Sequence, residues 1–379
     1  MATNGKGVAT ESKELQSLFE RIEFPSIPKE AGRKIAQLEQ EFIRAEVEQL
    51  RRSVPLMQPI YEKRNALINT PELQEADFWP RVFSNAPGEI DHYVLPSDAN
   101  IIGETLKNLT VERFEVDKDG NGEPRSVRLT FEFQTGEANR FFENAKLVKD
   151  FYWRQEVTKT AKGKRRTWEG LVSEPVRINW KEGMDPTKGL LDAACDLAEA
   201  EKKQGGDRKK LPEYEKLVKK VAEVEADAVT GGEDEEADDE DLGAASPAGV
   251  SFFAFFGYRG KDVSAEKSKE AEKEEEERWA KIAKGEKVED DEDEDEDDED
   301  DLEEDDLEDA EIFPDGEDLA VALAEDLWPG ALKYYVQSYE MADDFDSDID
   351  IDDMDDEEFD EEEAEKDDEE ERPRKKARN

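Results

Sequence analysis

The negative charge of this chain is concentrated in its last 149 residues. The whole sequence of 379 residues has 105 acidic and 53 basic side chains, a net charge of −52. Residues 1–230 hold 41 acidic and 37 basic side chains, or −4, so residues 231–379 carry the other −48. Segments this charged bury too little apolar surface to offset the entropy of ordering the chain. We therefore expect a folded front part followed by disordered acidic segments.

A polyanion of this kind selects its partners by charge. Glu289 to Asp301 is an unbroken acidic run, and a second acidic stretch fills residues 343–371. Such segments repel nucleic acid and anionic membranes and attract strongly basic proteins, of which histones are the abundant intracellular case. We expect little direct nucleic-acid binding and no membrane association. The sequence shows no apolar run of membrane-spanning length and no signal-peptide pattern.

Two smaller features bear on the compartment. Cys195 is the single cysteine, so no disulfide can form within the chain and a reducing compartment is expected. The sequence ends in a basic cluster directly after the acidic stretch, which predicts a nuclear-import signal read by importin. The alternative is a basic terminus without function. The basic residues of this cluster are Arg372, Arg374, Lys375, Lys376 and Arg378.

Residues 29–70 have the pattern of one long helix. Forty helical residues span about 60 Å, which is longer than a small domain is wide, so a second copy of the chain is the expected partner. Apolar residues spaced alternately by four and three predict the dimerisation seam. These are Ile43, Val47, Leu50, Val54, Met57 and Tyr61. Ile35, Leu38 and Phe42 continue the pattern with a shift in phase. Because Pro55 and Pro59 each cost about 3 kcal/mol inside a helix, two ordinary helices in a monomer remain the alternative.

The following sequence predicts an α+β domain with about four antiparallel strands. Val127 to Phe133 alternates apolar and polar residues, as a strand with one wet face does. The apolar segment 251–256 is expected in the core. Further strands are expected at 111–116, 147–154, 168–172 and 176–180, and helices at 97–106, 190–200, 212–226 and 319–327, with a fully solvated helix at 264–288. The predicted parts are an N-terminal segment 1–28, the long helix 29–70, a domain 71–342 and a disordered tail 343–379.

Catalytic and metal-binding patterns are weak. Asp117 to Gly122 resembles the start of a calcium loop, but the twelfth position is Arg128 where a glutamate is required, so a hairpin turn is favoured. His92 is the only histidine, which leaves Cys195 with His92 as a weak pair and Cys195 in a core as the simpler interpretation. The sequence therefore predicts no enzyme activity and no cofactor.

Two charged regions have open interpretations. A basic cluster at a predicted hairpin (Lys159, Lys162, Lys164, Arg165 and Arg166) could be a solvated loop or an internal partner for the acidic tail. Contact with DNA is disfavoured, because five charges do not overcome the repulsion between phosphate and a protein of net charge −52. The acidic tail is punctuated by Phe345, Ile349, Ile351, Met354 and Phe359. These apolar residues could be without function. They could also enter apolar pockets on a basic partner and set its register.

The order of several motifs resembles the nucleosome assembly protein family, and the short spacing from Leu67 to Phe78 resembles its SET-like branch. The resemblance covers roughly residues 30–190, 250–257 and 318–371. The motifs are Gln58-Pro-Ile-Tyr-Glu-Lys-Arg64, Phe78-Trp79 with Phe83, Val127 to Phe133 leading to Phe141-Phe-Glu-Asn144, Ile178-Asn-Trp180-Lys-Glu-Gly183, Ser251 to Phe256, and Asp326-Leu-Trp328-Pro with Tyr334-Tyr335.

This resemblance implies a nuclear histone chaperone. It implies a homodimer through long antiparallel helices, with one α/β "earmuff" domain per subunit that binds core histones on its acidic underside and through its tail. Relative to compact members, residues 193–249 and 258–316 resemble insertions. The alternative is an acidic regulator that binds a phosphatase or a histone acetyltransferase. The implied histone-binding residues are Asp318, Glu325, Asp326, Phe345, Asp352, Asp353, Glu357 and Phe359.

Overall fold

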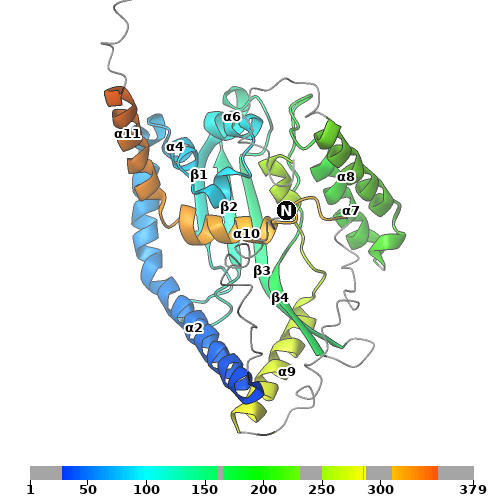
Figure 1. Cartoon of the computed structure of the whole chain (residues 1–379). Coiled ribbons are helices and arrows are strands. Elements are labelled where there is room, and N and C mark those ends of the chain that lie inside the picture. Colours follow the sequence, from blue (N-terminus) through cyan, green and yellow to red (C-terminus); the bar gives the residue numbers. More distant parts are fainter. Residues whose placement is uncertain are drawn as a thin grey trace, which may run out of the picture.

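The computed structural model of the chain describes residues 28–159, 165–205, 207–230, 250–284, 286 and 310–348. A four-stranded antiparallel sheet in the order β1-β2-β3-β4 stands at its centre, and the long helix α2 runs along one side (Figure 1). The strands are β1 (Leu106–Glu112), β2 (Val127–Phe133), β3 (Lys146–Lys159) and β4 (Arg165–Ser173). The helices are α2 (Lys29–Ile68), α3 (Pro71–Glu75), α4 (Phe78–Ser84), α5 (Gly88–Asp91), α6 (Pro96–Thr105), α7 (Leu190–Gln204), α8 (Pro212–Thr230), α9 (Ala265–Ala283), α10 (Gly316–Ala322) and α11 (Ala331–Asp348). Short helical turns are η1 (Gly136–Ala138), η2 (Arg208–Lys210), η3 (Phe252–Gly257) and the π-helical η7 (Leu323–Leu327).

The α+β class predicted from the sequence is confirmed, and the alternation in β2 has the predicted consequence. Val127, Leu129, Phe131 and Phe133 are all buried, while Arg128 on the other face pairs with Asp150 across the sheet at 2.6 Å. Successive strand residues point to opposite faces, so one face forms the core and the other carries cross-strand polar pairs.

The core is built on the phenylalanine-rich turn η3. Every residue from Phe252 to Gly257 is buried, as the sequence predicts. Phe256 packs edge-to-face on Phe131 of β2, with ring centroids 5.4 Å apart. Asp98 anchors the start of the turn, because its carboxylate accepts hydrogen bonds from the Ser251 hydroxyl and the Phe252 amide. The turn thereby covers the apolar face of the sheet.

Helix α2 is continuous over 40 residues, including Pro55 and Pro59. Its C-terminal end is attached to the domain, where Ile68 is fully buried, and its N-terminal end reaches toward α9 (Figure 1). The prolines therefore do not divide it into two helices. Among the described residues, no helix combines the length and the apolar character needed to span a membrane.

Three predicted elements differ from the structure. Residues 176–180 form no strand, because the Val176 amide bonds to the Phe256 carbonyl at 2.8 Å instead of to the sheet. Helix α9 is not solvated on all sides: its buried Ala271 and its Ser268, which accepts a bond from the Gln155 amide, hold it on β3. The strand expected at 111–116 is β1, which begins at Leu106 directly after α6.

The two regions expected as insertions contain parts of the domain. Helices α7 and α8 lie at the far edge of the sheet from α2 (Figure 1). Leu197 of α7 and Leu217 of α8, from the first region, and Phe313, from the second, are buried in the main core. After the turn at 328–330, where the sequence predicts the end of the helix at 319–327, a new helix α11 begins and continues to Asp348, past the tail boundary expected at residue 343.

Candidate functional site

A groove of about 780 Å³ lies between α2, β1 and η7, and we call it the α2 groove. It lies between two places where α2 meets the rest of the chain: the C-terminal end of α2 is attached to the domain, and the N-terminal half contacts α9 (Figure 1). The residues that line it include Leu50, Val54, Met57 and Tyr61 of α2, Val111 and Glu112 of β1, Arg113 and Phe114 after β1, and Glu325, Trp328 and Pro329 at η7 and the turn after it.

The closed end of the groove is aromatic. Tyr61 packs on Trp328 with ring centroids 4.1 Å apart, and the indole N–H of Trp328 donates to the Leu109 carbonyl at 3.0 Å. The guanidinium of Arg64 lies over both rings and donates to the carbonyl oxygens of Trp328 and Pro329. Burial lowers the pKa of Arg64 to about 10, so it stays charged at neutral pH. These contacts hold α2 at a set position on the domain.

The rim of the groove is acidic. Four carboxylates line it, those of Glu46, Glu62, Glu112 and Glu325, against the single guanidinium of Arg113. Arg113 donates to Glu325 at 3.1 Å and to the Pro124 carbonyl at 2.6 Å, so its charge is already partly engaged. An apolar floor with an excess of exposed carboxylates suits a basic segment that carries apolar side chains.

The six residues predicted for the dimerisation seam lie on the side of α2 that faces its own domain. Leu50, Val54, Met57 and Tyr61 line the α2 groove. Ile43 and Val47 line a second cavity, which α9 and β4 close from the other side. In this structure the predicted seam is therefore occupied or flanked by the same chain.

A different side of α2 carries the most exposed apolar residues, and we call it the outer stripe. Its members and exposed fractions are Ile35 (45%), Leu38 (53%), Phe42 (60%), Leu56 (72%), Ile60 (56%) and Leu67 (52%). At 3.6 residues per turn they fall within about 60° of one another and about 110° from the middle of the predicted seam. The phase shift at Ile35, Leu38 and Phe42 was its sequence signal. The first three continue into the last three, and not into the predicted seam.

The predicted histone-binding residues divide into described and undescribed positions. Asp318, Glu325 and Asp326 are exposed on α10 and η7. Glu325 lies at the α2 groove, and Asp326 accepts a hydrogen bond from the Tyr334 hydroxyl at 2.8 Å. The backbone at Phe345 is part of α11. The positions outside the described residues are Asp352, Asp353, Glu357, Phe359 and the import residues Arg372, Arg374, Lys375, Lys376 and Arg378.

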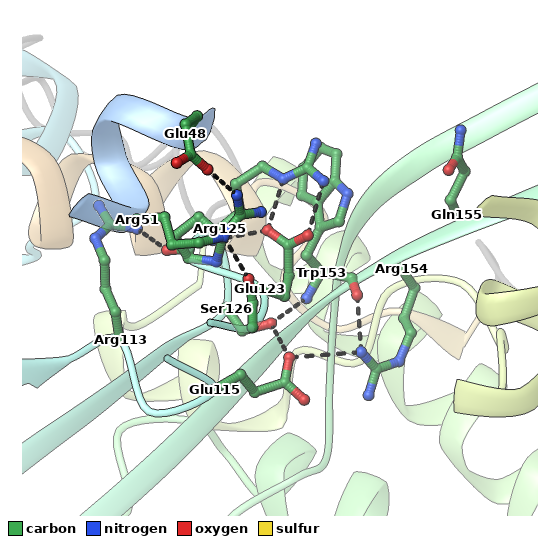
Figure 2. Close-up of polar contacts among 12 residues, drawn as sticks. Glu48, Arg51, Arg113, Glu115, Glu123, Arg125, Ser126, Trp153, Arg154 and Gln155 are labelled. Atoms are coloured by element: carbon green, nitrogen blue, oxygen red, sulfur yellow. Dashed lines mark hydrogen bonds and ion pairs between the residues drawn. The ribbon is translucent and has the colours of Figure 1, made fainter. Parts of the chain in front are cut away.

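A polar network joins the middle of α2 to the loop between β1 and β2 (Figure 2). Arg51 pairs with Glu48 and donates to the Gly122 carbonyl at 2.8 Å. In the loop, Arg125 pairs with Glu123 at 2.8 Å and lies over the Trp153 ring of β3 at 4.2 Å. Sequence analysis missed this brace, because no local pattern indicates which loop α2 crosses.

This loop between β1 and β2 contains Asp117 to Gly122, whose sequence resembles the start of a calcium loop. In the structure these residues form a turn. The Asp117 carboxylate accepts backbone hydrogen bonds from Asp119 and Asn121, both at 2.9 Å. The bonds from Asn121 are the largest cause of a lowered pKa for Asp117. Gly120 and Gly122 have positive φ angles of 79° and 116°. The predicted hairpin turn therefore describes the loop, with its carboxylate used by the backbone.

Titratable side chains in the core serve the fold. Lys149 is fully buried, and its ammonium donates to the carbonyls of Glu174, Phe256 and Tyr258 at 2.7–3.1 Å; burial lowers its pKa to about 7. Burial raises the pKa of Cys195 to about 11, which keeps the thiol protonated and unreactive at neutral pH. Within the described ranges, no group of three His, Cys, Asp or Glu side chains could hold a metal ion.

Arg165, one residue of the basic cluster at the β3–β4 hairpin, pairs with acidic side chains of α9. Arg165 is 8% exposed and pairs with Glu274, at 3.6 Å, and with Glu275 of α9. Arg278 pairs with the same Glu275 at 3.5 Å. Arg165 is therefore not a solvated loop residue, because it pairs with α9, whereas pairing of the cluster with the acidic tail stays a prediction. Lys162 and Lys164 lie outside the described residues.

One family model, several curated proteins and several solved structures are similar to this chain. A model of the nucleosome assembly protein (NAP) family matches residues 74–338. The chain is 36% identical over 154 residues to the Schizosaccharomyces pombe protein C36B7.08c, which is named as a nucleosome assembly protein; the alignment covers 41% of this chain and 59% of that one. It is 31% identical over 149 residues to vacuolar protein sorting-associated protein 75 of Saccharomyces cerevisiae; this alignment covers 37% of this chain and 49% of that one.

The chain thus spans about half to three fifths of the length of these curated relatives. A crystal structure of a Ccp1 mutant has a TM-score of 0.46 at 24% identity, covering 83% of this chain and 98% of that one.

Proposed function

The chain belongs to the nucleosome assembly protein family, and on this premise we propose that it is a histone chaperone that binds core histones without catalysing a reaction. The observation that carries the proposal is the α2 groove, with its aromatic floor and its four carboxylates against one guanidinium. A basic histone segment with apolar side chains satisfies both features. The contiguous acidic sequence at 289–301 would add attraction of longer range.

The mechanism is a competition between two polyanions for the histone. Carboxylates at the groove and in the acidic segments cover the basic surface of a histone and so prevent its non-specific contact with DNA. DNA displaces the chaperone where it offers a better-matched site, since its phosphates are denser. Binding should therefore weaken with added salt, because screening shortens to about 8 Å near 0.15 M.

We also propose that the protein forms a homodimer through the outer stripe of α2. The six residues of this stripe are 45–72% exposed over a helix of 40 residues, which an isolated soluble domain seldom leaves open to water. Two such helices packed against each other would bury both stripes. The previously predicted seam is less suited to this role, because Tyr61 is already packed on Trp328 and Ile43 and Val47 face α9.

Nuclear localisation through the basic cluster at 372–378, bound by importin, completes the proposal. The cluster lies outside the described residues, so sequence alone supports it. Deleting residues 372–379 from a fluorescent fusion in cells that lack the intact protein should make it mainly cytoplasmic. Full nuclear accumulation of the deleted form would show that another segment carries import.

The test of the groove compares two sets of four substitutions with the same change in net charge. The groove set replaces Glu46, Glu62, Glu112 and Glu325 by glutamine. The control set replaces four exposed glutamates outside the groove, Glu72, Glu75, Glu89 and Glu137. Histone affinity at about 0.15 M salt should fall at least about tenfold for the groove set, which corresponds to about 1.4 kcal/mol, and much less for the control set.

The possible outcomes separate the site from the function. Equal losses in both sets would mean that only total charge matters and that the groove is not the site. Absence of histone binding by the unaltered protein would refute the chaperone proposal itself. Both measurements use the full chain, with its acidic segments present.

A further inference from the structure

Helix α11 is attached to the domain along one side. Ala331 is fully buried and Tyr334 is 6% exposed. Tyr335 stacks on Phe78 of α4, with ring centroids 4.6 Å apart, and the Tyr334 hydroxyl donates to Asp326 at 2.8 Å. These contacts place the first turns of α11 in one orientation, so the side chains on its other face have set positions.

A second side of α11, about 110° around the helix from the attached one, presents apolar side chains to solvent, and we call it the α11 stripe. Leu332, Val336 and Tyr339 are 43%, 53% and 42% exposed. Their spacing of four and then three residues places them on one face of the helix, as in helices that pack on a partner helix. Arg81 of α4 lies over the Tyr339 ring at 4.6 Å and holds that ring at the edge of the stripe.

The charge around the stripe is one-sided. Lys333 is the single basic residue of α11, whereas the helix contains Glu340 and four aspartates, and the sequence continues as an acidic stretch to Glu371. The four aspartates are Asp343, Asp344, Asp346 and Asp348. This density of carboxylates repels phosphate-bearing partners, both nucleic acids and anionic membranes. It attracts a cationic one, and the stripe adds a requirement for apolar surface.

We propose that the α11 stripe is the anchoring surface for an amphipathic helix rich in lysine and arginine. This proposal rests on the proposed function, under which the helix belongs to a core histone. The apolar side of the partner helix packs on Leu332, Val336 and Tyr339, and its basic side is attracted by the acidic sequence that follows Glu340. The stripe thus gives the acidic tail that follows it a fixed starting point and a register on its partner.

An anchored polyanion and a free polyanion differ in their response to salt. Screening weakens the attraction between charges, whereas contact between buried apolar surfaces is not screened. The contribution of the stripe should therefore be small at low salt, where charge dominates, and should become the larger share of the remaining affinity at high salt.

The experiment measures histone affinity of the full chain across a salt series. In the test variant, Leu332→Gln and Val336→Gln remove the apolar groups and keep the net charge; Tyr339 is left because it contacts Arg81. The matched control carries Val148→Gln and Met184→Gln, which alter side chains that are 37% and 41% exposed away from α11. We expect about a tenfold loss for the test variant near 0.5 M salt, a loss below about twofold near 0.05 M, and no loss for the control. Polylysine, a purely charged probe, should bind both variants equally.

Several results would overturn the proposal. Equal histone affinity of the test variant and the unaltered protein at every salt concentration would mean that the α11 stripe does not contribute to histone binding. A change in mass by light scattering for the test variant would assign the stripe to a second copy of the chain. Thermal unfolding establishes that the variants remain folded. If the unaltered protein binds no histone, the proposed function fails first, and that outcome is distinct from a stripe that does not contribute.

Discussion

The two sides of α2 differ in what they face. The inner side faces the domain of the same chain. There Tyr61 packs on Trp328, and carboxylates line the α2 groove. The outer side is a stripe of six apolar residues open to solvent. One helix of 40 residues therefore carries two surfaces of different chemistry. The inner one is mixed and suits a charged, exchangeable partner. The outer one is apolar and suits a permanent partner.

This difference shows why a single apolar pattern was not enough to assign a role to the helix. Both sides have residues at steps of three and four, and both would be apolar stripes in an isolated helix. The domain covers part of one stripe and leaves the other free. The free stripe then becomes the candidate for self-association, and the partly covered one becomes the wall of a binding groove.

The largest expected effect concerns the outer stripe. Phe42→Glu, Leu56→Glu and Ile60→Glu together place six charges in the proposed dimer interface. Since burying such a side chain contributes about 1.5–3 kcal/mol, the dimer dissociation constant should rise by at least about a thousandfold. Sedimentation or light scattering measures it.

The matched control places the same charges on the inner side, as Val47→Glu, Leu50→Glu and Val54→Glu. It should leave the dimer intact while weakening histone binding at the groove. If the inner-side variant is a monomer and the outer-stripe variant remains a dimer, the dimer forms through the seam that the sequence predicts and not through the outer stripe.

A second prediction breaks the attachment of α2 to the domain. Trp328→Ala removes the stack on Tyr61 and the hydrogen bond to the Leu109 carbonyl. Loss of a large buried aromatic side chain typically costs about 3–5 kcal/mol, which urea unfolding would measure. Trp168→Ala, at a half-buried tryptophan of β4, should cost distinctly less. Equal costs would mean that the Tyr61 contact adds nothing to the attachment.

A third, smaller effect is expected at the brace in Figure 2. Arg51→Ala removes a hydrogen bond to the Gly122 carbonyl, worth about 1 kcal/mol, and should speed amide hydrogen exchange in the loop 117–122. Arg52→Ala is the control, because Arg52 is exposed and pairs only locally with Glu48. Identical exchange rates in both variants would show that Arg51 does not hold the loop to α2.

The smallest effect is a pH dependence confined to the domain. Burial disfavours ionised Glu201, but hydrogen bonds from Arg208 and Arg259 outweigh it and hold the pKa of Glu201 below its ordinary 4.5. A carboxyl whose pKa is lower in the folded state stabilises the fold above the unfolded pKa, and this contribution is lost as pH falls through the folded pKa.

Glu201→Gln should therefore reduce stability near neutral pH and flatten its decline below about pH 4.5, as measured by urea unfolding at a series of pH values. Glu137→Gln, at an exposed residue, should leave the decline unchanged. A decline in the Glu201→Gln variant as steep as in the unaltered protein would contradict this role of Glu201.

Much of the fold could be predicted from local sequence. The alternation at Val127 to Phe133 predicted β2 with its boundaries, and the apolar density of 251–256 predicted burial. Periodicity failed where long-range contacts decided the outcome. Residues 176–180 alternate like a strand, yet the amide of Val176 bonds to the phenylalanine turn. The sequence of α9 predicts a fully solvated helix, yet the small side chains of Ala271 and Ser268 let it approach β3 closely.

The sequence by itself determined the charge distribution, the length of α2 and the presence of apolar stripes along it, because these depend only on the order of residues and the helical repeat. Tertiary structure decided which stripe stays exposed and where the carboxylates gather. Glu46 and Glu62 of α2, Glu112 of β1 and Glu325 of η7 are distant in sequence and meet at one groove. They meet because the contacts of Trp328 with Tyr61 and Arg64 set the angle at which α2 leaves the sheet. No local pattern encodes that angle, since it depends on residues more than 250 positions apart.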